Sequence, residues 1–153
     1  MKLSTRGRYG IHAMYDLAQA WRATRGPQPL KALAQRQRLS EPYLEQLLGA
    51  LRKGGLVRTV RGAQGGYMLS RAPEEITVGQ VLRTLEGDLA FVECLEGEEA
   101  CDKSARCPMR LVWQKVHEGV NRIVDSITLE DMLKDYARLS AEGEKTDDTH
   151  LHG

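Results

Sequence analysis

The three cysteines of the chain fall within one short stretch, where their spacing can support metal chemistry. Six residues separate Cys94 from Cys101, and five residues separate Cys101 from Cys107. Thiolates are soft ligands that suit iron–sulfur clusters or zinc. Structural zinc sites are typically built from close Cys-x-x-Cys pairs, whereas this looser spacing leaves a loop that can wrap a cluster. We therefore expect these cysteines to hold an iron–sulfur cluster, with zinc as the second choice.

Two further interpretations of the cysteines stay open. In the first, all three cysteines are free thiols. In the second, two of them form a reversible disulfide that works as a thiol switch. An odd number in one stretch argues against a secreted disulfide framework. The opening residues MKLSTRGRYG contain no apolar run, and no segment approaches the roughly 20 apolar residues that a membrane helix needs. We expect a cytoplasmic protein with reduced thiols and no membrane partner.

Charge is divided unevenly between the two halves of the chain. Residues 1–72 carry 13 Lys and Arg against 3 Asp and Glu, whereas residues 73–153 carry 9 against 18. The halves therefore have net charges of +10 and −9, and the whole chain has +1. A contiguous basic half beside an acidic half is typical of a protein that meets nucleic-acid phosphates with one part only. We expect double-stranded DNA as the partner of the first half.

The basic half begins with a pattern of helices. A first helix can begin at Ser4 or Thr5, either of which can cap it. A short helix over residues 30–37 then leads to Ser40, which can cap a second helix over 41–53 with leucines along one side. Two short helices joined by a tight turn match a helix-turn-helix, although ordinary helical domains also contain this pattern.

A β-hairpin directly after the helix pair makes the DNA-binding interpretation more specific. Residues 56–60 and 67–69 read as strands around the turn at 61–66. A capping box at Thr77 and Gln80 then opens a helix that continues to about Glu86. We expect a mainly α fold with a small β-hairpin wing, organised as a winged helix-turn-helix domain over residues 1–86.

The residues expected to touch DNA lie on the second helix, on the hairpin and at the amino terminus. Glutamate can accept a hydrogen bond from cytosine, and glutamine can bond adenine. The alternative for Glu45 is an ordinary exposed carboxylate. Near the start of the second helix, the candidates for the major groove are Tyr43, Glu45 and Gln46. Cations for the DNA backbone or minor groove are Arg52, Lys53, Arg58 and Arg61, and Arg6 and Arg8 are expected on phosphates.

The acidic half divides into a cysteine-bearing loop over 87–107, helices over 108–139 and a disordered tail over 140–153. The helix that begins at Pro108 has an apolar stripe at heptad-like spacing. Pairing with a second copy explains such a stripe on a projecting helix better than core packing does. We expect a homodimer, with a short last helix after the stripe. The apolar stripe comprises Met109, Trp113, Val116, Val120, Ile123 and Ile127.

Four segments of the sequence resemble the IscR/NsrR family of bacterial winged-helix regulators. They are LSTRGRYGIHAMYDLA at 3–18, YLEQLLGALRKGGLVRTVRGAQGGYML at 43–69, ITVGQVL at 76–82 and ITLEDML at 127–133. The resemblance implies a homodimer on a palindromic or partly palindromic operator. It also implies an iron–sulfur cluster on the three cysteines, with 2Fe–2S favoured over 4Fe–4S. The expected function is repression of iron–sulfur assembly, redox or cysteine-metabolism genes under control of that cluster.

The chain departs from this family at the cluster segment. Arg110 stands where the IscR subgroup usually has a histidine, and a guanidinium cannot ligate iron. The first cysteine spacing is also one residue longer than usual. The resemblance implies a non-cysteine ligand from the first helix of the partner subunit, so we expect His12 as the fourth ligand. It shares a polar helix face with Arg8, Asp16 and Gln19. The alternatives are His117 and the carboxylates Glu93, Glu98 and Asp102.

Two other functional classes fit the sequence less well. The chain has no Ser/His/Asp arrangement and no phosphate-cradling loop motif, so we expect no enzyme. An iron–sulfur carrier or electron-transfer protein would use the cysteines but would have no use for a basic winged half. A cluster-free thiol or zinc regulator of the same fold remains the nearest alternative.

Overall fold

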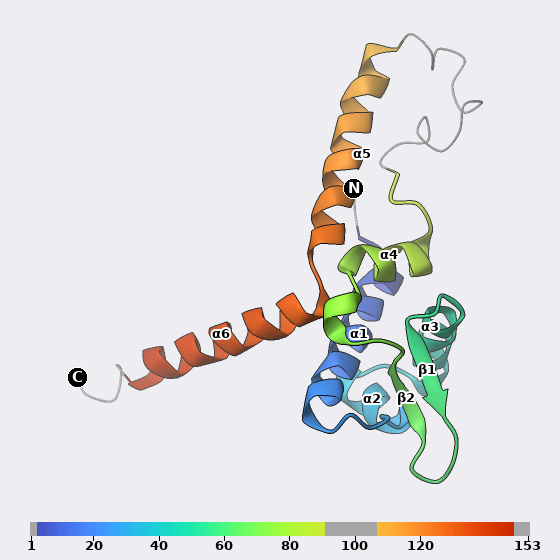
Figure 1. The fold of residues 1–153 in the computed structure, drawn as a ribbon, viewed down its shortest axis with the longest axis vertical. Coiled ribbons are helices and arrows are strands. Elements are labelled where there is room, and N and C mark those ends of the chain that lie inside the picture. Colours follow the sequence, from blue (N-terminus) through green and yellow to red (C-terminus); the bar gives the residue numbers. More distant parts are fainter. Residues whose placement is uncertain (1–2, 91–106, 149–153) are drawn as a thin grey trace.

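Helices make up most of the described part of this computed structural model, which comprises residues 3–90 and 107–148 (Figure 1). The mainly α fold with a small hairpin wing, as expected from the sequence, is confirmed. In chain order the elements are α1 (Thr5–Ala23), α2 (Leu30–Gln37), α3 (Glu41–Lys53), β1 (Val57–Val60), β2 (Gly66–Leu69), a single 3-10 turn (Pro73–Glu75), α4 (Val78–Glu86), α5 (Pro108–Ser126) and α6 (Leu129–Asp148).

Side-chain caps fix where three helices of the first domain, α1, α3 and α4, begin. Ser4 caps α1, and the Ser40 hydroxyl accepts a hydrogen bond from the Tyr43 N–H at 3.3 Å. At α4 the cap is reciprocal. The Gln80 N–H donates to the Thr77 hydroxyl at 3.1 Å, and the Thr77 N–H donates to the Gln80 side chain at 3.0 Å. These caps satisfy N–H groups that have no partner inside the helix.

One hydrophobic core joins α1 to α4, the hairpin and the start of α6. Burying a leucine side chain contributes about 2 kcal/mol, so the leucine-rich faces of these elements drive their association. Because α6 supplies one of the most deeply buried residues, its first turn is part of the winged domain. The core side chains with less than 2% exposure include Met14, Leu17, Leu33, Leu44, Leu47, Leu48, Leu51, Leu69, Ile76, Val81 and Leu129.

The wing is anchored to the connection between α1 and α2. β1 pairs antiparallel with β2, with Val57 opposite Leu69. On the other edge of β2, Gln28 and Tyr67 exchange backbone hydrogen bonds of 2.8 and 2.9 Å. Gly66, whose φ is +154°, lets the backbone of Gln28 approach so closely that a side chain at position 66 would collide with it. The base of the wing therefore has a fixed position relative to α1 and α2.

Asp16 lies elsewhere than the helix pattern predicts. We expected it on the exposed polar face of α1, but it is 8% exposed and lies between α1 and α2. Arg36 Nε donates to both Asp16 carboxylate oxygens at 3.2 Å, and Gln37 Nε2 donates to one of them at 2.9 Å. A buried carboxylate needs such partners, and both come from α2.

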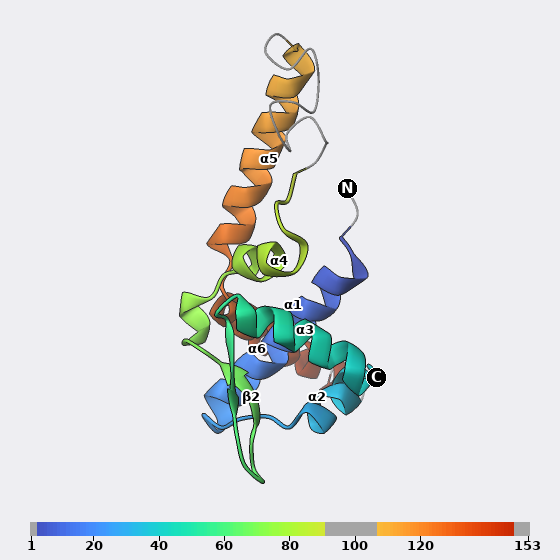
Figure 2. The same cartoon turned by 90° about the vertical axis from the view of Figure 1, so that its right-hand side faces the viewer.

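The helix α5 projects away from the winged domain, and none of its residues is buried (Figures 1 and 2). Two backbone hydrogen bonds hold its carboxyl end. The Val78 N–H donates to the Ile127 carbonyl at 2.8 Å, and the Leu129 N–H donates to the Ile76 carbonyl at 2.9 Å. The start of α4 and the junction between α5 and α6 therefore move together.

The last helix is longer than the sequence indicates. We expected a short helix and a disordered tail over 140–153, but α6 continues to Asp148, so that expectation is wrong up to this residue. A reciprocal cap between Thr128 and Asp131 starts the helix, and the hydrogen bonds from Thr128 lower the pKa of Asp131. Polar residues that are good helix formers extend it, which composition alone does not reveal. Among the described residues, no helix is both long and apolar enough to cross a bilayer.

Candidate nucleic-acid interface and cysteine segment

The face of α3 that points away from the core forms one side of a shallow groove. The helix buries its leucines at 44, 47, 48 and 51, which leaves its polar residues exposed on the opposite side. The groove has a volume of about 510 Å³. Its lining residues are Arg6, Glu45, Gln46, Gly49, Ala50, Arg52, Lys53 and Tyr67. The structure thus places five of the expected DNA contacts, from two different helices, in one surface groove.

The first helix positions Arg6 beside the groove. Its Nε donates to the carbonyl of Leu85 at the end of α4, at 3.0 Å. This bond uses one donor of the guanidinium, which has five, so the remaining ones are available for an anion. Arg6 therefore combines a fixed stem with a free cationic end, as a phosphate contact requires.

The other expected contacts lie around the groove. Arg58 and Arg61 are exposed on the wing. Arg8 is exposed on α1 with its guanidinium over the ring of Tyr9, 5.3 Å from the centroid. Tyr43 is half-buried, and its ring meets that of Tyr9 edge-on at 6.2 Å. This packing makes Tyr43 a support for the start of α3 as well as a candidate contact.

Gly49 is a feature of the groove that the sequence pattern did not reveal. It lies in the middle of α3, where glycine costs about 1 kcal/mol relative to alanine. Apart from the neighbouring backbone of α3 itself, no described atom lies within 4 Å of the place that a Cβ would occupy. Internal packing therefore does not explain this glycine. Its neighbours along the groove are Glu45, Gln46, Arg52 and Lys53, so the helix backbone is bare where a ligand would approach.

Only one of the three cysteines falls within the described residues. Cys107 is half-buried, forms no disulfide and lies at the N-cap of α5. Cys94 and Cys101 lie outside the described residues, as does most of the loop expected over 87–107. The amino end of a helix favours bound anions, so the position of Cys107 fits an anionic thiolate cluster. Among residues 3–90 and 107–148, no three metal-ligating side chains come together.

His12 and Cys107 belong to different helices, His12 to α1 and Cys107 to the N-cap of α5. His12 is exposed on α1 and lines a hollow of about 340 Å³ against α6, with Tyr15, Met132 and Tyr136 among its neighbours. Cys107 caps the end of α5 that lies farthest from the winged domain (Figure 1). Ligation by His12 therefore needs the histidine of a second copy, as the sequence interpretation supposed.

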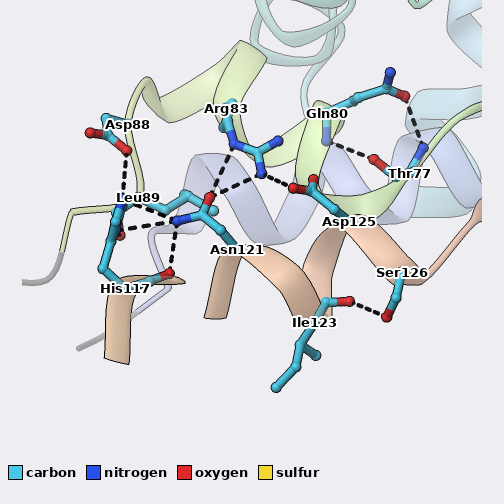
Figure 3. Close-up of polar contacts among 10 residues, drawn as sticks. All are labelled: Thr77, Gln80, Arg83, Asp88, Leu89, His117, Asn121, Ile123, Asp125 and Ser126. Atoms are coloured by element: carbon cyan, nitrogen blue, oxygen red, sulfur yellow. Dashed lines mark hydrogen bonds and ion pairs between the residues drawn. The ribbon is translucent and has the colours of Figure 1, made fainter. Parts of the chain in front are cut away.

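His117 lies on α5, where its ring nitrogens face the residues that lead into the cysteine segment. Its Nδ1 is 3.1 Å from the Leu89 carbonyl, and its Nε2 is 3.6 Å from the Asp88 carboxylate (Figure 3). The ring holds the segment after α4 against α5.

Comparisons with known proteins agree with this geometry. A model of the Rrf2 family, described as iron-dependent transcriptional regulators, matches residues 3–135. The transcriptional regulator CymR of Bacillus subtilis is 45% identical over 132 residues, which are 86% of this chain and 89% of that protein. The solved structure of CymR, described as the global cysteine regulator of B. subtilis, has a TM-score of 0.71 and 42% identity, covering 86% of this chain and 95% of its own. An IscR structure from T. potens has a TM-score of 0.72 and 50% identity, covering 89% and 88%.

Replacing Gly49 should change the stability of the chain and its affinity for DNA in opposite directions. We expect Gly49→Ala to stabilise the chain against urea by about 0.5–1 kcal/mol, because alanine is the better helix former. The same methyl group should weaken DNA binding, because it stands where the backbone faces the ligand. Gly143→Ala on α6 is the matched control, since its Cβ also meets open space. If Gly49→Ala binds duplex DNA as tightly as the unaltered chain, α3 does not approach DNA with this face.

Proposed function

This chain belongs to the Rrf2 family of iron-dependent transcriptional regulators, and from that premise we propose that it binds duplex DNA as a homodimer under control of an iron–sulfur cluster. It is a transcriptional regulator and not an enzyme. The observation that carries the proposal is the groove on α3, which gathers cations and base-reading side chains from α1 and α3. We propose that the protein acts in the cytoplasm as a repressor on a palindromic or partly palindromic operator.

Within the groove, the proposed contacts divide into reading and positioning roles. Glu45 and Gln46 are exposed early on α3, where they can read cytosine and adenine in the major groove. Arg52 and Lys53, in the last turn of α3, meet the phosphate backbone. Arg58 and Arg61 place the wing on the backbone or in the minor groove, where narrow A·T-rich stretches attract arginine. A carboxylate at Glu45 repels DNA unless it pairs with a base donor, so it favours particular sequences.

Salt dependence tests the electrostatic part of this proposal. The logarithm of the association constant for duplex DNA should fall linearly with the logarithm of salt concentration, by about 0.9 for each phosphate neutralised. Arg61→Ala should reduce that slope by about 0.9 per copy, because it removes one phosphate contact. Arg138→Ala, whose arginine lies on α6, should leave the slope unchanged. Binding that does not respond to salt would show that this face does not meet DNA.

The apolar stripe of α5 supports the proposed dimer. Met109 and Ile123 are 55% and 60% exposed, although both are large and hydrophobic. Trp113, Val116 and Ile127 are half-buried on the same stripe. Val120 is also half-buried, but it lines a hollow together with Leu82 of α4, so it is shared between the domain and the stripe. A second α5 laid on this stripe would cover side chains that one copy leaves in water.

Two substitutions on α5 test whether the stripe is the interface. Ile123→Glu should convert dimers to monomers, because a carboxylate would be buried in an apolar seam. Leu111→Glu is the matched control, since Leu111 is 62% exposed on the same helix but lies off the stripe. Sedimentation velocity measures both. If the two variants sediment alike, the chains do not pair through the stripe.

The chemistry of the three cysteines supports control by an iron–sulfur cluster. Cys94, Cys101 and Cys107 would hold an iron–sulfur cluster, 2Fe–2S in preference to 4Fe–4S, with His12 of the partner subunit as the fourth ligand. When bound, such a cluster supplies redox and ligand-exchange chemistry at the amino end of α5. A second candidate is a cluster-free thiol regulator of the same fold. It is favoured by the similarity to CymR, which is described as a cysteine regulator.

Alanine substitutions at the cysteines distinguish these candidates. Protein purified without oxygen should show cluster absorbance with matching iron and acid-labile sulfide. Cys94→Ala, Cys101→Ala and Cys107→Ala should each lose that absorbance while the dimer stays folded. His12→Ala should shift the midpoint potential, because imidazole ligation raises it relative to thiolate ligation. Here His117→Ala serves as the comparison. A colourless unaltered protein that forms a reversible disulfide would support the thiol regulator instead.

A further inference from the structure

A cluster of polar side chains ties α4 to the projecting helix α5, away from the groove and from the cysteines. Arg83 Nη2 donates to the Asp125 carboxylate at 2.6 Å and to the Asn121 side-chain oxygen at 3.0 Å (Figure 3). Arg83 Nε donates to the same Asn121 oxygen at 3.3 Å. The Asn121 amide nitrogen in turn donates to the His117 carbonyl at 2.9 Å, one turn earlier on α5. One guanidinium therefore holds two successive turns of α5.

Gly79 allows the Asp125 side chain of α5 to come close to α4. It is buried on α4, one turn before Arg83, and a Cβ at this position would collide with the Asp125 carboxylate. Glycine inside a helix is unfavourable unless something needs the space. Here the Asp125 side chain occupies that space, so α4 contributes the glycine and α5 contributes the carboxylate to the contact.

The contacts of Arg83 with Asn121 and Asp125 help to set the angle of α5, because the helix has few other contacts with the winged domain. Its carboxyl end is pinned by the backbone bonds of Val78 and Leu129, which act as a pivot. None of its residues is buried, and its apolar side chains that face α4 are only half-buried, such as Val120, which lines a hollow with Leu82. Rotation about the pivot is therefore limited by Arg83 and by the His117 contact with Leu89.

The residues next to Arg83 on α4 contact the DNA-binding elements directly. Thr84 lies against Gly54, the C-cap of α3, so closely that a side chain at position 54 would collide with it. Leu85 accepts the hydrogen bond from Arg6, which lines the groove. One turn of α4 thus connects α5 on one side to α3 and α1 on the other.

Small changes in this angle matter on DNA. Two recognition helices must meet half-sites whose separation is fixed by the helical repeat. For an arm of about 15 Å, half the diameter of a small domain, a rotation of roughly 7° moves α3 by about 1.8 Å. Two copies turning in opposite senses double this to about 3.6 Å, close to one base-pair step of about 3.4 Å.

From this geometry we infer that Arg83 is a positioning residue that sets the half-site spacing the dimer accepts. It touches no DNA, and it acts by holding the winged domain at one angle to α5 through Asn121 and Asp125. The inference rests on the proposed dimeric DNA binding. It adds a determinant of operator choice that lies outside the groove.

The test uses duplexes that the unaltered full-length chain selects from a random pool. From them we would build a series with two copies of the selected half-site, spaced by the selected distance or by one or two base pairs more or less. The unaltered chain should prefer one spacing. Arg83→Ala should weaken that preference at least about threefold, while binding to an isolated half-site stays within about twofold. Asp125→Asn, which keeps the side-chain shape, should shift the preference in the same direction.

Arg138→Ala is the control, because it removes an exposed arginine–aspartate pair on α6. It should keep the spacing preference of the unaltered chain. The inference is overturned if folded Arg83→Ala and Asp125→Asn both keep that preference, or if they weaken isolated half-site binding as much as spaced binding. If the unaltered chain selects no duplex at all, the proposed DNA binding itself fails.

Discussion

The arrangement of this protein depends on how the exposed helix α5 is attached to the winged domain. A helix of 19 residues that buries none of them has no core to fix its direction. Its position depends on two backbone hydrogen bonds at one end and on the Arg83 contacts with α4 along its side. Because α4 also packs on α1 and α3, the orientation of the groove follows from the same attachment.

The charges of the chain are distributed differently over the winged domain and over α5 and α6. Arg6, Arg52 and Lys53 of the basic half line the groove of α3, and Arg58 and Arg61 are exposed on the wing, while the second half of the chain supplies α5 and α6. Cys107 lies at the far end of α5, which separates the candidate cluster from the DNA face of the same copy. A signal therefore has to reach that face through α5 and α4, or through the proposed ligand His12 on α1 of the partner subunit.

The helices and strands could be predicted from the sequence because the residues that begin and shape each of them lie within it or next to it. Ser40 and Thr77 sit next to the helices that they cap, and the leucines of α3 repeat within that helix. The contacts that orient the elements could not be predicted in this way. Asp16 finds its partner on α2, Gln28 pairs with the wing, and Arg83 meets a residue 42 positions away. No periodicity records such pairs. Gly49 was visible as a glycine inside a helix, but only the structure shows that no packing requires it.

The central claim is that two copies, joined along α5, present their α3 grooves to one face of a duplex. A hydroxyl-radical footprint of the unaltered protein on a selected duplex tests it most directly. We expect two protected stretches related by a two-fold axis, with centres about one helical turn of 34–36 Å apart or a multiple of it. A single protected stretch, or protection without two-fold symmetry, would contradict it.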